Sequence, residues 1–250
     1  MTLDPLVLLA LAGVGALAGF VDAIGGGGGL IALPALLAAG VPPITALGTN
    51  KVQSVIGTGM AALTYWRGGF ISFRDLVLSI VVTFIAACFG AWLVKQIDIS
   101  ILKTAVPVAL IVMAAYFLFA PRLTDESRHT RLAFPTLVPV LGATVGFYDG
   151  AFGPGTGTFL TVGFVVLFGL GLTRAAGHTK ILNLTSNLGA LAVFIPSGDV
   201  LWIAAAAMAV GQFAGGYLGA MAGIRFGARI IRPIVIAVAG ALALKLLLFP

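Results

Sequence analysis

Ten apolar stretches constrain the fold of this 250-residue chain more than any other feature of its sequence. A helix needs about 20 apolar residues to span the hydrocarbon core of a membrane, and eight of the stretches are about that long. The other two, 29–40 and 156–170, are shorter, and each follows a glycine cluster. The runs do not alternate polar and apolar residues as barrel strands do, so the sequence predicts helices. The stretches are residues 3–24, 29–40, 44–66, 76–95, 100–120, 132–150, 156–170, 174–196, 199–222 and 228–249.

The composition supports a membrane protein and excludes several other classes. Hydrophobic residues make up 60% of the chain and charged residues 9%, with a mean hydropathy of +1.14. A soluble domain carries about 25% charged residues, so a soluble globular protein, a disordered chain and a nucleic-acid-binding protein are excluded, despite the net charge of +6. Cys88 is the sole cysteine, and no cluster has metal-ligand spacing, so we expect no metal and no cofactor. We predict an all-α polytopic membrane protein with roughly 8–10 membrane segments.

The arginines orient the chain across the membrane. If the ten segments alternate in direction, all nine arginines fall on one side and Lys95, Lys103 and Lys245 on the other. The positive-inside rule places the arginine side in the cytoplasm and both termini on the periplasmic or extracellular side. The arginines are Arg67, Arg74, Arg122, Arg128, Arg131, Arg174, Arg225, Arg229 and Arg232.

The chain contains an internal repeat. The motif Gly-Phe-Val-Asp at 19–22 recurs as Gly-Phe-Tyr-Asp at 146–149, and the motif that ends in a lysine at 46–51 recurs at 175–180. We therefore divide the chain into a first transmembrane repeat, a cytoplasmic linker and a second repeat. Each half holds five segments, an odd number, so the second half is inverted relative to the first. An inverted repeat with glycine-broken or re-entrant short segments is typical of secondary transporters. The three parts are residues 1–120, 121–131 and 132–250.

Glycines occur in two patterns with different consequences. Gly211, Gly215, Gly219 and Gly223, spaced four apart, favour close helix packing, either within the chain or in a homodimer. Five consecutive glycines at 25–29 cannot form a stable helix interior. Non-helical backbone at membrane depth is tolerated where it is buried or lines a wet cavity, so we expect this run to line a cavity or to form a tight interfacial turn.

Four ionisable residues lie within apolar segments, one aspartate and one lysine in each half. Such residues are functional or paired by default, since a charge at the centre of a membrane helix costs about 3 kcal/mol. In one interpretation, Asp22 pairs with Lys51 and Asp149 with Lys180, which holds each half together. In the other, the lysines attract an anion, and the aspartates take up protons or form salt bridges.

Polar side chains gather around both lysines and suggest how an anion would be held. At helical spacing they form rows that can replace the hydration shell of an oxyanion, and the glycine breaks add backbone N–H donors at helix starts. His178 stands where the first half has Thr49, as a proton relay or a neutral hydrogen-bonding side chain. The predicted substrate-binding residues are Lys51, Lys180, Asn50, Thr49, Gln53, Ser54, His178, Thr179, Asn183, Asn187, Gly26, Gly28, Gly153 and Gly155.

At these residues the chain closely resembles the sulfite exporter TauE/SafE family of bacterial membrane transporters. The resemblance is carried by residues 19–30 and 46–54, by their counterparts at 146–157 and 180–187, and by 227–233. It covers both repeats. The resemblance implies a multi-pass protein of the bacterial inner (plasma) membrane that exports sulfite, sulfoacetate or a related sulfur oxyanion or organosulfonate.

We therefore expect a secondary transporter that exports a small anion by alternating access, and not an enzyme. The expected partners are a small anionic substrate and the lipid bilayer, with a possible homodimer and no nucleic acid. Two alternatives remain open. One is a cation- or proton-coupled transporter that uses Asp22 and Asp149 as ligands. The other is a non-transporting membrane component of sulfur metabolism.

Overall fold

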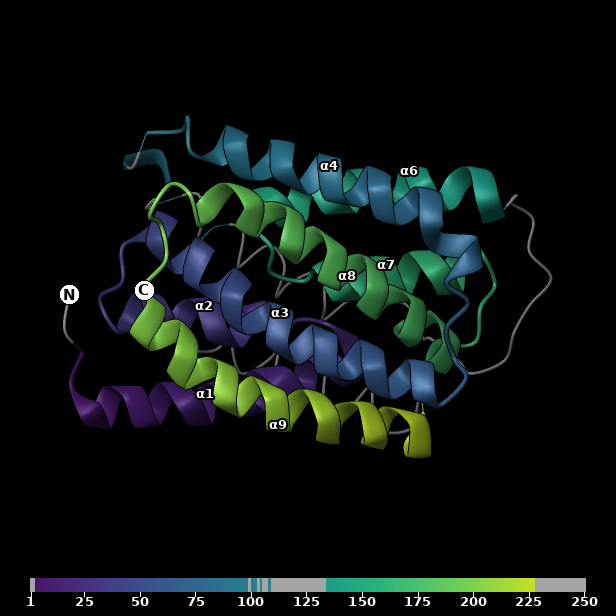
Figure 1. Cartoon of the computed structure of the whole chain (residues 1–250), viewed down its shortest axis with the longest axis horizontal. Helices are drawn as coiled ribbons and strands as arrows, with labels where there is room; N and C mark the ends of the chain where they lie inside the picture. The colour runs from purple at the N-terminus through teal and green to yellow at the C-terminus, as the bar shows by residue number, and fades with distance from the viewer. Residues whose placement is uncertain (1–2, 99, 103, 105–107, 109–133, 228–250) are drawn as a thin grey trace.

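The protein is a bundle of helices (Figure 1). The computed structural model describes residues 3–98, 100–102, 104, 108 and 134–227, and within them every regular element is helical. The predicted segment 228–249, the linker 121–131 and most of segment 100–120 lie outside the described residues, with the lysines and arginines that they carry. The elements are α1 (Pro5–Gly25), α2 (Gly29–Ala38), α3 (Pro43–Arg67), η1 (Arg74–Leu76), α4 (Val77–Val94), α6 (Phe134–Ala151), α7 (Thr156–Val166), α8 (Leu172–Phe194) and α9 (Trp202–Phe226).

Helix boundaries follow the prolines, glycines and caps of the sequence. Asp4 caps α1 by accepting the Leu6 N–H at 2.7 Å, and proline occupies the first position of both α1 and α3, where no N–H is needed. These boundaries agree with the apolar stretches, and the prediction of an all-helical polytopic membrane protein is confirmed.

The two short stretches form half-length helices that point away from the middle of the bundle. α2 has 10 residues and α7 has 11, about 15 Å each at helical rise. α2 begins at Gly29, where an added Cβ would lie 3.7 Å from the Asn50 amide nitrogen, and it ends just before α3 begins. α7 likewise begins beside the middle of α8 and ends before α8 begins. The N-termini of both half-helices therefore lie at the centre of the bundle.

The halves exchange their fourth helices. α9 packs on α1 and α3, whereas α4 packs on α6 and α8. We call α1, α2, α3 and α9 the first bundle, and α4, α6, α7 and α8 the second bundle. In Figure 1 the first bundle lies below the second. Contact between the bundles comes mainly from α3 against α8.

Residues that the sequence repeat pairs make equivalent contacts in the two bundles. A Cβ at Gly90 of α4 would overlap the carbonyl oxygen of Phe147, and one at Gly219 of α9 would overlap that of Phe20. Gly211, Gly215 and Gly219 of α9 pack against the backbone of α1 in the same chain. A homodimer would therefore need a surface other than this row of glycines.

The four described arginines lie at one end of the bundle. A Cβ at Gly177, near the start of α8, would lie 3.1 Å from the Phe70 carbonyl, and one at Gly68 would lie 3.3 Å from Ile224 near the end of α9. The loop after α3, the start of α8 and the end of α9 therefore meet at this arginine end. The residues are Arg67, Arg74, Arg174 and Arg225.

The outer helices are apolar and the central ones are polar. Three described helices are long and apolar enough to cross a membrane, namely Pro5–Gly25, Arg74–Val94 and Trp202–Phe226. They expose large hydrophobic side chains such as Ile85 and Val210. α3 and α8 have 25 and 23 residues, enough to span about 30 Å, but they bury their polar side chains in the interior.

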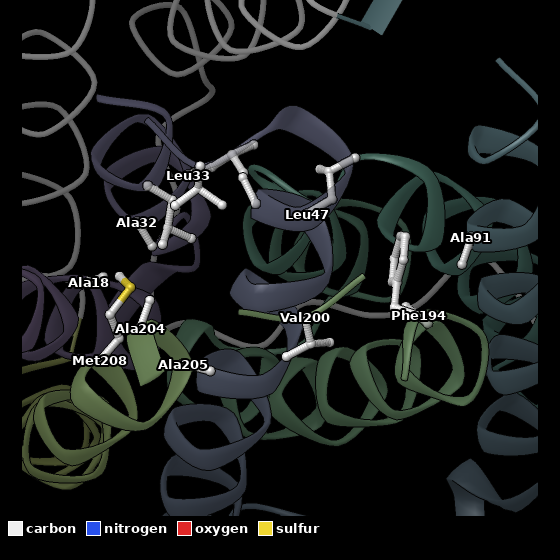
Figure 2. Packing of buried hydrophobic residues seen from close by; sticks show 14 of the residues in the cluster. Ala18, Ala32, Leu33, Leu47, Ala91, Phe194, Val200, Ala204, Ala205 and Met208 are labelled. Atoms are coloured by element: carbon white, nitrogen blue, oxygen red, sulfur yellow. The ribbon is translucent and has the colours of Figure 1, made fainter. Parts of the chain in front are cut away.

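A cluster of buried apolar side chains fills the end of the bundle opposite the arginines. Figure 2 shows Leu33 of α2, Leu47 of α3, Phe194 of α8 and Met208 of α9 among its members. A second cluster around Phe164 occupies the arginine end. The polar centre of α3 and α8 lies between these two apolar layers.

Two glycines of α1 provide a matched test of this packing. A Cβ at Gly15 would overlap the Met208 carbonyl of α9, whereas a Cβ at Gly13 would have nothing within 4 Å. We expect Gly15→Ala to lower the melting temperature of the purified protein, since overpacking costs about 1–3 kcal/mol. Gly13→Ala should leave it unchanged or raise it, because alanine favours the helix by about 1 kcal/mol. Equal melting temperatures for the two variants would contradict the α1–α9 contact.

Candidate functional site

The glycine breaks of the two halves touch each other. A Cβ at Gly26 would overlap the backbone of Gly157, and the Thr158 hydroxyl donates a hydrogen bond to the Gly25 carbonyl at 2.7 Å. Because α1 ends at Gly25, no following helical N–H donates to this carbonyl, and the Thr158 side chain of the other half does so instead. The two breaks are therefore in direct contact at the centre of the protein.

Positive φ angles explain why glycine occupies these breaks. Gly26 has φ +77° and Gly153 has φ +94°, in the region that side chains rarely adopt. The second break is also held by the Tyr148 hydroxyl, which donates to the Pro154 carbonyl at 2.7 Å. Each break is thus fixed by its own hydrogen bonds and by contact with its counterpart.

The buried charges pair across the halves. Lys51 Nζ lies 2.8 Å from Asp149 Oδ1, and Lys180 Nζ lies 3.1 Å from Asp22 Oδ2. The expectation that Asp22 pairs with Lys51, and Asp149 with Lys180, is therefore wrong. Those partners are 29 and 31 residues apart in the sequence, but the packing of the two halves places the aspartate of each half beside the lysine of the other. The ion pairs hold the halves to each other instead of closing each half.

Each ion pair also connects the two bundles. Lys51 is on α3 of the first bundle, and its partner Asp149 is on α6 of the second. In the other pair, Lys180 is on α8 of the second bundle and Asp22 is on α1 of the first. Both lysine side chains are 1% exposed. A buried pair that loses one partner leaves an uncompensated charge in a region of low dielectric constant.

A polar cavity of about 20 Å³ lies between the bundles, next to both ion pairs. A volume of this size holds about one water molecule. Every residue that lines it is an aspartate, asparagine, serine, threonine or glycine, and the N-termini of α2 and α7 open onto it. The lining residues are Asp22, Gly27, Gly29, Asn50, Ser54, Asp149, Gly153, Gly155, Thr156, Gly157, Asn183 and Asn187.

Eight predicted site residues therefore line the cavity. The two lysines do not line it, but each is paired with an aspartate that does. The eight include one pair of side chains that the repeat relates, Ser54 on α3 and Asn183 on α8, each three residues after the lysine of its half. The eight are Asn50, Ser54, Asn183, Asn187, Gly153, Gly155, Asp22 and Asp149.

Five other predicted residues do not line the cavity. Thr49 accepts the Leu201 N–H at 2.9 Å, and Thr179 accepts from Thr161 at 3.1 Å, so both serve packing between elements. Gln53 donates to Asn50 at 2.7 Å and thus supports a residue that does line it. Gly26 and Gly28 shape the break: Gly26 meets Gly157, and the Gly28 N–H donates to Asp22 at 3.4 Å.

His178 lies away from the cavity, near the arginine end. Its Nδ1 lies 2.8 Å from the Arg174 carbonyl oxygen, and its ring packs against Phe134 and Phe164. These contacts match the interpretation of a hydrogen-bonding histidine within a packed environment. They provide no proton path from this ring to Lys180.

Thr156 is the main site residue that sequence reasoning missed. Its hydroxyl lies 2.8 Å from Asp149 Oδ1 and 2.7 Å from the Gly153 carbonyl oxygen, and it lines the cavity at the first residue of α7. A hydroxyl residue directly after a glycine break is the signal that could have identified it. The repeat places Gly29 at the equivalent position, so no such hydroxyl stands beside Asp22.

The fold and the site define a polytopic helical membrane transporter, with half-helices that meet at a charged centre. The sequence profile described as "Sulfite exporter TauE/SafE" matches residues 11–246. The chain belongs to the sulfite exporter TauE/SafE family.

Relatives across bacteria agree with this assignment. The chain is 43% identical over 234 residues to a probable membrane transporter protein, ORF9, of Sinorhizobium sp, covering 94% of this chain and 90% of that protein. It is 41% identical over 244 residues to the probable membrane transporter protein YfcA of Escherichia coli strain K12, covering 98% and 91%. For YdhB of Bacillus subtilis the identity is 27% over 218 residues, covering 86% and 88%. No solved structure matches the chain significantly.

These findings favour a membrane transporter over the other classes. The relatives are named as probable transporters and not as enzymes. The alternative of a non-transporting membrane component is therefore set aside.

A double-mutant series tests the crossed pairing. We expect Lys51→Met to lower the melting temperature strongly, because removing one partner of a buried pair costs about 3–5 kcal/mol. Adding Asp149→Asn should recover most of the loss, since it removes the uncompensated carboxylate. Adding Asp22→Asn instead is the matched control and should not recover it. Recovery by Asp22→Asn would show that the pairing lies within the first half.

Proposed function

We propose that this protein is a secondary transporter that exports a small anion, namely sulfite or a related sulfur oxyanion or organosulfonate, by alternating access. The observation that carries the proposal is the polar cavity between the bundles, flanked by Lys51 and Lys180. The family description and the resemblance of the motifs support a sulfur oxyanion as the substrate.

Two sources of positive potential converge on the cavity. Lys51 and Lys180 are each paired with an aspartate that lines the cavity. The starts of α2 and α7 add the positive ends of two helix dipoles. Asparagine amides from both central helices supply further donors for oxyanion oxygens. An anion at this point would compete with Asp22 and Asp149 for the lysines.

The small size of the cavity supports alternating access. Its volume of about 20 Å³ has room for about one water, so an oxyanion of four or five heavy atoms needs the bundles to move apart. The two apolar layers exclude water from either end while the centre is closed. Motion of one bundle against the other would open the centre to one side at a time.

The membrane supplies the driving force in this proposal. The glycine run lacks the lysine and hydroxyl residue of a nucleotide-binding loop, so ATP is not expected to take part. With the arginine end in the cytoplasm of a bacterial inner membrane and both termini periplasmic, an interior-negative potential favours anion exit by about 2.3 kcal/mol per charge per 100 mV.

A cation- or proton-coupled transporter is the second candidate. The observation in its favour is that two carboxylates, from Asp22 and Asp149, face the same cavity. In this alternative the aspartates bind the transported cation, and the lysines only close the site. Loss of either carboxylate would then abolish substrate binding itself.

We expect sulfite to raise the melting temperature of the purified protein in detergent, because a ligand that binds only the folded state stabilises it by RT ln(1 + [L]/Kd). Sulfoacetate, taurine, sulfate, thiosulfate and chloride complete the panel. Lys51→Ala and Lys180→Ala should abolish both the shift and sulfite efflux from proteoliposomes. Lys95→Ala is the matched control, since Lys95 pairs with Asp199 at 2.5 Å, away from the cavity.

The outcomes separate the two candidates. Efflux that persists in both Lys51→Ala and Lys180→Ala would overturn the anion site. A thermal shift with a cation, and with none of the anions, would favour the second candidate.

A further inference from the structure

The two crossed ion pairs are not equivalent, although the repeat relates them. Lys180 Nζ donates to the Asp22 carboxylate and also to the backbone carbonyl of the same residue. The other carboxylate oxygen of Asp22 accepts the Gly28 N–H at 3.4 Å. Both oxygens of this carboxylate therefore have donors, and the lysine has two acceptors.

The pair of Lys51 and Asp149 leaves polar atoms without partners. Asp149 Oδ1 takes both the ion pair and the Thr156 hydroxyl. Among the described residues, Asp149 Oδ2 has no donor, and Lys51 Nζ makes no aligned hydrogen bond in addition to its ion pair. Both side chains are buried, with 1% and 3% exposed. An unpaired carboxylate oxygen in such a place is costly, so a partner gained at Oδ2 during function would stabilise it.

The charge balance of the centre indicates which partner Oδ2 gains. Two lysines and two aspartates make the centre neutral. An anion that entered alone would bury one uncompensated negative charge or more, which is expensive in a region of low dielectric constant. A proton on Oδ2 removes the charge of Asp149, releases Lys51 for the anion, and turns an acceptor without a donor into a donor.

We propose that Asp149 takes up a proton at Oδ2 when an anion binds at Lys51, while Asp22 stays ionised as the structural partner of Lys180. The proposal rests on the proposed function and deepens it by assigning a coupling proton to one of two repeat-related carboxylates. The proton comes from the same aqueous side as the anion and leaves Oδ2 when the anion leaves. A divalent oxyanion still moves net negative charge, so the membrane potential continues to drive its exit.

Two other titratable side chains, on α6 and on the neighbouring α4, already donate hydrogen bonds to backbone carbonyls. The Tyr148 hydroxyl on the same helix donates to Pro154, and the Cys88 thiol on α4 donates to the Gly189 carbonyl. α7 carries no titratable side chain. Of the charged groups around Asp149, Lys51 of α3 pairs with it, and Asp22 of α1, the partner of Lys180 of α8, lines the same cavity. Tyr148 precedes it on α6, and Cys88 is on α4, which packs against α6.

Proton counting in matched variants tests the assignment. Titration calorimetry with sulfite, repeated in buffers of different ionisation enthalpy, gives the number of protons bound per anion. Ionisation of sulfite itself contributes equally to every variant and cancels in the difference. We expect Asp149→Asn to take up about one proton fewer than the unmodified protein, and Asp199→Asn, which removes a carboxylate paired with Lys95 away from the cavity, to take up the same number as the unmodified protein.

An infrared difference spectrum of the unmodified protein keeps the test decisive if Asp149→Asn does not fold. Sulfite should induce the C=O stretching band of a protonated carboxylic acid, and this band should persist in Asp199→Asn. Equal proton counts in all three proteins, equal losses in both variants, or absence of the band would overturn the assignment. Sulfite binding that depends on Lys51 would leave the proposed function intact in those cases, whereas no sulfite binding to the unmodified protein would overturn both.

Discussion

Four charges buried between apolar helices impose the constraint on which the rest of this structure depends. Each would cost about 3 kcal/mol at the centre of a membrane helix if it stood alone. Lys51, Lys180, Asp22 and Asp149 meet that cost by pairing, and each pair takes one residue from each half. The neutral centre can therefore exist only when both halves are folded and in contact. The polar side chains of α3 and α8 lie around this centre because nowhere else in the membrane interior would accept them.

The glycine breaks solve a second problem of the same centre. A helix that stops inside a membrane exposes N–H and C=O groups that lipid cannot satisfy. Here the end of α1 meets the start of α7, and Thr158 of one half donates a hydrogen bond to the carbonyl of Gly25 in the other. Only glycine allows the backbones to approach so closely, as at Gly26 and Gly157. The starts of α2 and α7 then lie at the polar cavity, where the positive ends of their helix dipoles favour an anion.

Much of this organisation could be predicted from the sequence, because it depends on local chemistry. Apolar runs, prolines and glycines set the helix ends, and the matched motifs identified the residues that meet at the centre. The pairing of charges could not be predicted in this way, since Lys51 and Asp149 are brought together only by how the halves pack. Helical spacing alone also did not distinguish Thr49, which bonds the Leu201 backbone, from Asn50, which lines the cavity. One residue of offset along a helix turns a side chain by about 100°, and only the position of the neighbouring helices decides which face is which.

The exchange of fourth helices determines which motions are open to the protein. Close glycine contacts join α9 to α1 and α4 to α6, so each bundle is expected to move as a unit. The surface between the bundles is formed mainly by α3 and α8, and it contains the cavity and both ion pairs. Any motion that opens the cavity must therefore separate lysines from aspartates, which is unfavourable unless another anion takes the place of a carboxylate. Under the proposed function an anionic substrate would make the separation possible, whereas opening without an anion would leave charges unpaired. In the proposed mechanism the ion pairs therefore oppose opening without a substrate, and they are the point at which the anion would bind.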